Sequence, residues 1–162
     1  MNLRQFGRRL GACAVAAALA AGAAAAHDYA FGSLKITHPW SPVGPQGAPT
    51  IAGYLTIANG AGSPDKLLSA SSTAARSVEL HQESTQGGVM RMRAVTDGLA
   101  IPAHGAVTLT PGAYHLMLIG PRRAFRAGEA IPLDLRFSRE GVAHVALAVE
   151  AAKATPMAGM HM

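Results

Sequence analysis

Cysteine is nearly absent from this chain of 162 residues, since the only one is Cys13, inside an apolar leader. If the leader is removed on export, the working protein has no disulfide, no thiolate metal ligand and no cysteine nucleophile. That absence excludes thiol–disulfide exchange. It also excludes blue-copper electron transfer, because a blue-copper site needs a cysteine ligand.

Charged residues are scarce, at 14% of the chain, and no run rich in Lys or Arg interrupts it. Three of the 14 basic residues lie in the first nine positions, so residues 27–162 carry 11 basic and nine acidic residues, a balance of +2. The sequence pI of about 10.0 therefore reflects little of the working protein. We expect no nucleic-acid partner, because a basic surface of the usual kind is missing. The 136 residues of this part suffice for one domain with a hydrophobic core.

The first 26 residues have the pattern of a secretory signal peptide. Arg4, Arg8 and Arg9 precede an Ala-rich apolar run that ends in an Ala-x-Ala pattern, which predicts cleavage after Ala26. We therefore expect a periplasmic protein without a stable membrane anchor. Two other interpretations stay open. Leu10-Gly-Ala-Cys13 resembles a lipoprotein box, although almost no apolar stretch precedes the cysteine. The Arg8-Arg9 pair resembles a twin-arginine signal, although its flanks match poorly.

The remaining chain alternates apolar and polar residues with a period of two, interrupted by Gly, Pro, Asn and Ser. This pattern is typical of half-buried antiparallel strands and predicts an all-β domain, a β-sandwich with Greek-key connections. We place this domain at residues 27–152, followed by a flexible Met/His tail at 153–162. The alternating sets are Leu34, Ile36, His38, Trp40; Ile51, Gly53, Leu55, Ile57; Val78, Leu80; Val107, Leu109; Ile131, Leu133, Leu135, Phe137; and Val145, Leu147, Val149.

Residues 77–95 form two alternating runs around Gln-Gly-Gly, which predicts a β-hairpin. With Gln86-Gly87 as the two-residue loop, His81 lies directly opposite Met92. With Gly87-Gly88, His81 pairs with Ala94 and Met92 is its diagonal neighbour. Either register leaves a histidine and a methionine within reach of one another on one face.

A second His–Met pair lies on one predicted strand, residues 114–119. His115 and Met117 are two positions apart, so they project from the same face, and both faces of this strand are mostly apolar, which is typical of a central or covered strand. Two imidazoles and two thioethers are neutral donors that favour Cu(I) over Zn(II), Ca(II) or Mg(II). Spacing alone leaves open whether the two pairs meet, and whether these residues simply pack.

The order of these residues resembles the signature of the periplasmic PCu(A)C copper chaperones: His81, ten residues, Met92, twenty-two residues, then His-Leu-Met at 115–117. The surrounding sequence is similar as well. The matching segments are Val78 to His81, Gly88 to Met92, Pro111 to Gly120, Gly128 to Phe137, Trp40 and Ala52 to Asn59. The interval between the second and third ligands is one residue longer than is usual in that family.

The resemblance implies a cupredoxin-like β-barrel or sandwich and a Cu(I) site made by His81, Met92, His115 and Met117. It also implies a non-enzymatic metallochaperone that delivers copper towards the CuA centre of cytochrome c oxidase, alongside Sco-type copper proteins. None of these partners follows from spacing or composition.

Further His and Met residues are weaker candidates. Met90 shares the parity of Met92 and is either an accessory ligand or, as the sequence favours, a packing residue. The tail resembles His/Met-rich extensions of some relatives and is either an accessory site for Cu(I) or Cu(II) or a disordered segment. Its candidate ligands are Met157, Met160, His161 and Met162. Two alternatives remain: a copper oxygenase built on an amino-terminal His27, and a metal-free β-sandwich interaction module.

Overall fold

The computed structural model describes residues 28–151, and every regular element in this range is a β-strand. The eleven strands of the range are β1 (Tyr29–Phe31), β2 (Leu34–Pro42), β3 (Thr50–Asn59), β4 (Asp65–Ser71), β5 (Ala75–Gln86), β6 (Val89–Ala94), β7 (Leu99–Ile101), β8 (Ala106–Leu109), β9 (Tyr114–Pro121), β10 (Ala130–Phe137) and β11 (Val142–Glu150). No helix in this range has the length and apolarity to cross a membrane. The predicted signal peptide and the Met/His tail lie outside the described residues.

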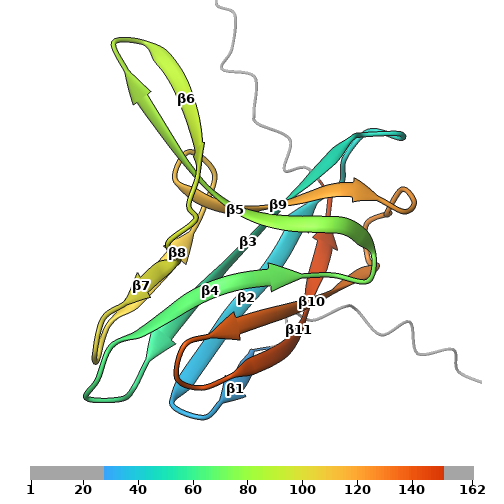
Figure 1. The fold of residues 1–162 in the computed structure, drawn as a ribbon. Helices are drawn as coiled ribbons and strands as arrows, with labels where there is room; N and C mark the ends of the chain where they lie inside the picture. Colours follow the sequence, from blue (N-terminus) through green and yellow to red (C-terminus); the bar gives the residue numbers. More distant parts are fainter. Residues whose placement is uncertain (1–27, 152–162) are drawn as a thin grey trace, which may run out of the picture.

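Seven strands close into a mixed barrel (Figure 1) in the order β2-β11-β10-β4-β5-β9-β3, and β3 pairs back with β2. All ladders are antiparallel except that of β11 with β2. The four remaining strands extend the barrel strands: β1 pairs with β2, β6 with β5, β7 with β4 and β8 with β3. The connections from β3 to β4 and from β9 to β10 each pass two intervening strands, as Greek-key connections do. The all-β, cupredoxin-like prediction is therefore confirmed.

The core is the set of residues that one parity of each strand turns inward. The fully buried side chains are Leu34, Ile36, Leu55, Ile57, Leu67, Ile101, Leu109, Leu116, Leu118, Ile131, Leu133 and Leu135. Each predicted alternating run lies on a strand. One prediction of shared parity is wrong: the β2–β3 register shifts between Thr37 and Trp40, and His38 has a positive φ of 47°. This irregularity turns the part-exposed Trp40 away from the buried Ile36.

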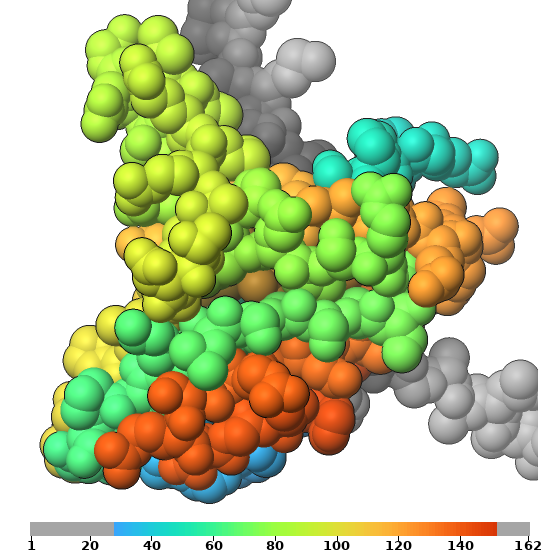
Figure 2. All heavy atoms as spheres, in the orientation of Figure 1, coloured from blue at the N-terminus to red at the C-terminus, as the bar shows by residue number. Residues whose placement is uncertain are grey.

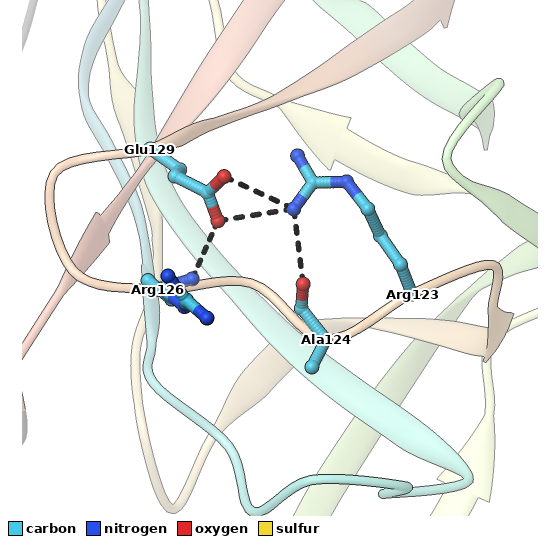
Figure 3. Close-up of polar contacts among 4 residues, drawn as sticks. All are labelled: Arg123, Ala124, Arg126 and Glu129. Carbon is cyan, nitrogen blue, oxygen red and sulfur yellow. Dashed lines mark hydrogen bonds and ion pairs between the residues drawn. The ribbon is translucent and has the colours of Figure 1, made fainter.

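The loop from β9 to β10 closes the end of the barrel that lies farther along β9 from His115. Arg123 Nη1 donates to both Glu129 oxygens at 3.0 and 3.1 Å (Figure 3), and the Arg126 backbone N–H donates to Glu129 at 2.6 Å. This backbone hydrogen bond, more than the Arg123 side chain, lowers the pKa of Glu129 from its usual 4.5. One carboxylate at the carboxyl end of the loop thus accepts hydrogen bonds from both Arg123 and Arg126.

The hairpin of β5 and β6 projects from the barrel (Figures 1 and 2). Its ladder pairs Gln86 with Val89, so the loop is Gly87-Gly88. The alternative with Gln86-Gly87 is wrong. Both loop residues have positive φ, 59° and 77°, as the turn type preferred in two-residue hairpins requires, and glycine adopts this conformation without steric cost.

Candidate metal centre

His81 on β5 and His115 on β9 lie directly opposite one another in the β5–β9 ladder. Their rings meet edge to face, with centroids 5.8 Å apart. His115 is only 3% exposed, and 16% of the His81 side chain is exposed. The predicted His–Met pairs are therefore linked through their histidines, a contact between strands that local spacing left open.

The two ring nitrogens of His81 have different surroundings. Nε2 lies 2.8 Å from a carboxylate oxygen of Glu79, two residues earlier on the same strand. Because an ionised carboxylate only accepts, Nε2 carries the proton, and Nδ1 is left with a free lone pair. Nδ1 is buried and has no hydrogen-bond partner among the described residues. Such a buried, unsatisfied atom costs about 1–3 kcal/mol, a cost that a bound cation would offset.

His115 repeats this arrangement with the backbone. Its Nδ1–H donates to the carbonyl oxygen of Ala113, at 3.4 Å, which leaves Nε2 as the nitrogen with a free lone pair. In metal sites, a ligating histidine almost always donates its other ring N–H to a carboxylate or a backbone carbonyl. Both histidines satisfy this condition.

Met117 lies two residues beyond His115 on β9, on the same face and half-buried. It is directly opposite Glu79 on β5 and Ala52 on β3. Glu79 therefore sits beside both a histidine and a methionine of the predicted set. The prediction that the strand of His115 and Met117 is central is confirmed, because β9 pairs with β5 on one side and with β3 on the other.

Met92 on β6 pairs with Glu83, two positions along the hairpin from the pair formed by His81 and Ala94. It therefore occupies the face of His81 as a diagonal neighbour, at roughly 7 Å between Cβ atoms, which a flexible thioether side chain spans. Met92 is 49% exposed. The predicted pair of His81 and Met92 thus shares a face, at the edge of the barrel, with Met92 open to solvent.

A row of aromatic rings continues the site across the neighbouring strands. The Tyr54 ring on β3 lies 6.5 Å from that of His115, and Trp40 on β2 lies 4.8 Å from Tyr54. Tyr54 is 9% exposed, and burial, with a smaller effect of the Glu83 charge, raises the pKa of its hydroxyl above 10.0. The phenol therefore stays neutral and forms an apolar wall behind His115.

Tyr54, Glu79 and Glu83 were not singled out as site residues from the sequence. A signal existed for the acids, since both share the strand parity of His81. For Tyr54 the signal was its position on the parity opposite to Gly53, Leu55 and Ile57. The contact of Tyr54 with His115 depends on the β3–β9 pairing, which local patterns do not encode.

The candidate donors are two soft thioether sulfurs and two borderline imidazole nitrogens. Across residues 28–151, no group of three His, Cys, Asp or Glu side chains is placed to hold a metal ion. Hard and borderline cations need several nitrogen or oxygen ligands, and the described residues offer no such group of three. Two imidazole nitrogens with thioethers of Met92 and Met117 instead make a neutral, soft donor set that fits Cu(I).

Another hollow, about 260 Å³ in volume, lies near the Arg123–Glu129 loop. It is lined by prolines and apolar residues, including Pro42, Pro45, Pro121 and Phe125, and by Arg122 and Arg123. Both arginines already donate to protein oxygens, Arg122 to the carbonyl of Thr73. The hollow contains no histidine or methionine, so the chemistry of the predicted site does not occur there.

A seven-stranded, cupredoxin-like barrel with a His–Met face defines a domain of the PCuAC class. The family described as "Putative lipoprotein LpqE-like" matches residues 34–149, and the chain belongs to this family. A curated relative, "Putative lipoprotein Lxx21020" of Leifsonia xyli subsp. xyli, is 31% identical over 117 residues, which cover 72% of this chain and 69% of the relative.

Solved structures of the same class superpose on the barrel. The copper-bound PCuAC domain of PmoF2 is 30% identical with a TM-score of 0.66, covering 77% of this chain and 98% of that domain. The Cu(I) form of DR1885 from Deinococcus radiodurans is 29% identical with a TM-score of 0.58, covering 81% of this chain and 85% of that protein. The predicted relationship to the PCu(A)C family is thus confirmed.

Proposed function

We propose that this protein is a periplasmic copper metallochaperone that binds one Cu(I) through His81, Met92, His115 and Met117. The observation that carries the proposal is the orphaned Nδ1 of His81, buried beside His115. Each histidine has one nitrogen held by an oxygen and the other free. Copper-bound forms of two relatives support the choice of metal.

The spacing of the rings suits a shared ion. A metal–nitrogen bond of about 2.0 Å, with the nitrogen roughly 1.2 Å from its ring centroid, puts two rings that share one ion at most about 6.4 Å apart. The observed separation of 5.8 Å lies within this limit. Met117 on the same strand as His115, and Met92 on the hairpin, then complete four-coordination with thioether sulfur.

The donor set also suits a carrier rather than an enzyme. Neutral imidazole and thioether ligands leave the positive charge of Cu(I) in place and hold it less tightly than thiolates, so the ion can be released. Methionine ligands also persist in an oxidising compartment, where thiols pair. The copper-oxygenase alternative depends on His27, which lies outside the described residues. The metal-free alternative predicts that no copper binds.

We further propose that the acceptor is the CuA centre of cytochrome c oxidase, reached alongside Sco-type copper proteins. The similarity of residues 81–120 to the PCu(A)C signature supports this step. The test uses cells that lack the protein, grown with scarce copper. Loss of CuA, restored by the wild-type gene but not by a His81→Ala copy, is expected, and normal CuA content in those cells would contradict the delivery step.

The relatives' description as lipoproteins supports export to the cell envelope. We propose release after Ala26 rather than lipid attachment at Cys13, because the apolar run follows that cysteine instead of preceding it. Amino-terminal sequencing of protein from the envelope fraction distinguishes the two. The tail residues Met157, Met160, His161 and Met162 remain a proposed accessory copper site for Cu(I) or Cu(II), also outside the described residues.

Cu(I) titration against a competing chromogenic chelator tests the proposed site. The wild type is expected to take up one equivalent. His81→Ala, His115→Ala, Met92→Leu and Met117→Leu are each expected to weaken binding by at least about tenfold, or about 1.4 kcal/mol. Unchanged affinity in all four variants would rule out the site. Loss only on deletion of residues 157–162 would move the site to the tail.

A further inference from the structure

β6 exposes large apolar side chains, which therefore contribute little free energy of burial to the fold. Of the five exposed large hydrophobic residues in the described range, three lie on this strand: Val89 at 57%, Met90 at 66% and Met92 at 49%. Burial of a methionine would contribute roughly 1.5–3 kcal/mol, which these positions forgo. The interpretation of Met90 as a packing residue is therefore wrong, and its exposure needs another explanation.

The hairpin register divides these residues between two faces. Met90 pairs with Thr85 and Met92 with Glu83, so both methionines project from the face that carries His81. The opposite face holds Arg91 and Arg93, which line a hollow with Gln82, Ser84 and Gln86, and Met92 reaches the edge of the same hollow. The methionines thus form a line that leads away from the histidines, along a hairpin that stands clear of the barrel (Figure 2).

Exposure rises steadily along this line. His115 is 3% exposed, Met92 49% and Met90 66%. His115 itself is buried, with the Tyr54 ring 6.5 Å from its own, and its neighbour Leu116 lies in the core, so a partner has little access beside His115. A partner can reach the hairpin from solvent. The Met92 end of the site is thus an exposed side at which another protein can contact the copper.

We propose that Met90 is a transfer ligand, which together with Met92 forms an outer, two-thioether Cu(I) site at the mouth of the inner one. This inference rests on the proposed function. Residues two apart on a strand are separated by roughly 6.8 Å, and two flexible methionine side chains span that distance to share one soft ion.

The transfer step is a ligand exchange without oxidation or reduction. The bonds from copper to the two histidine nitrogens and to the Met117 sulfur break as a bond to the Met90 sulfur forms, while Met92 stays bound. The ion remains Cu(I), both imidazoles return to their neutral apo state, and no proton or electron is exchanged. A soft donor of the partner, thiolate or thioether, then displaces the two methionines.

Stopped-flow transfer of Cu(I) from the loaded full-length protein to bathocuproine disulfonate, with absorbance as the readout, tests this role. Met90→Leu keeps size and apolarity but removes the sulfur, and Val89→Leu is the matched control on the other face of β6. Met90→Leu is expected to slow transfer at least about tenfold while equilibrium affinity stays within about twofold. The control is expected to transfer at the wild-type rate.

Two results would overturn the inference while leaving the proposed function intact. One is a wild-type transfer rate in Met90→Leu. The other is an affinity loss in Met90→Leu as large as that in Met92→Leu, which would make Met90 an inner ligand. If the wild type itself takes up no Cu(I), the proposed function fails and the transfer role fails with it.

Discussion

Glu79 and His81 lie two residues apart on β5, and the Glu79 carboxylate accepts a hydrogen bond from Nε2 of His81 at 2.8 Å. This contact fixes the ring orientation. It leaves the buried Nδ1 as the ring nitrogen whose lone pair can bind a metal. The carboxylate therefore prepares the histidine for the metal without needing to touch it.

Replacing Glu79 should weaken copper binding through this orientation. Glu79→Gln removes the charge that holds the Nε2–H tautomer. Cu(I) affinity is expected to fall about 10- to 100-fold, as when other groups that hydrogen-bond to a metal-ligating histidine are replaced. Glu83→Gln is the matched control, since Glu83 pairs with Met92 and makes no hydrogen bond to His81. Chelator competition measures the affinity, and ¹⁵N NMR of the imidazoles reports the tautomer. Equal affinities in the two variants would contradict the role.

Tyr54 should make stability depend on alkaline pH. Because burial raises its pKa in the folded state, its hydroxyl contributes stability that is fully present below pH 10.0, the unfolded value, and is lost as the pH rises through the folded pKa. Tyr54→Phe lacks this group. Urea unfolding is expected to show the wild type losing stability relative to Tyr54→Phe above pH 10, with a constant difference between pH 7 and 9. A constant difference at every pH would refute the assignment.

The Gly87-Gly88 turn sets the position of Met92, so strain there should reach the copper site. Gly88→Ala places a side chain at φ 77° with open space around it, so the cost is conformational, about 1 kcal/mol. Cu(I) affinity is expected to fall up to about fivefold, as the hairpin spends more time open. Gly128→Ala is the control: its φ is 88°, its surroundings are equally open, and it lies in the distant β9–β10 loop. An equal loss in both would point to global destabilisation instead.

Metal preference should follow from the methionines. Because no three His, Cys, Asp or Glu side chains are placed together within residues 28–151, the wild type is expected to bind Zn(II) weakly. Met117→His would put a third imidazole beside His115, and isothermal titration should then show Zn(II) binding gained and the preference for Cu(I) reduced. Zn(II) binding by the wild type as tight as that of the variant would contradict the soft-donor assignment.

The sequence was sufficient for the parts of the fold and site that depend on local periodicity. Alternation located most of the strands, though not β1, β4 or β7, and the two-residue interval put His115 and Met117 on one face. The hairpin loop was ambiguous, because Gln-Gly-Gly offers two registers and only the backbone conformation at Gly87 and Gly88 selects one.

Long-range pairing accounts for what periodicity missed. The opposition of His81 and His115 depends on β5 pairing with β9, and the approach of Tyr54 depends on β9 also pairing with β3. Neither is encoded in a local pattern. The exposure of Met90 could not be predicted either, since a strand with alternating residues is buried or exposed according to what covers it, and β6 pairs only with β5 among the described strands.

X-ray absorption at the copper edge of the Cu(I)-loaded protein tests the central claim most directly, because it counts nitrogen and sulfur neighbours of the metal. The wild type is expected to show two nitrogen and two sulfur ligands. Met92→Leu and Met117→Leu should each lose one sulfur, and His81→Ala should lose one nitrogen. A shell without sulfur, or a sulfur count that neither methionine variant changes, would show that copper is bound elsewhere.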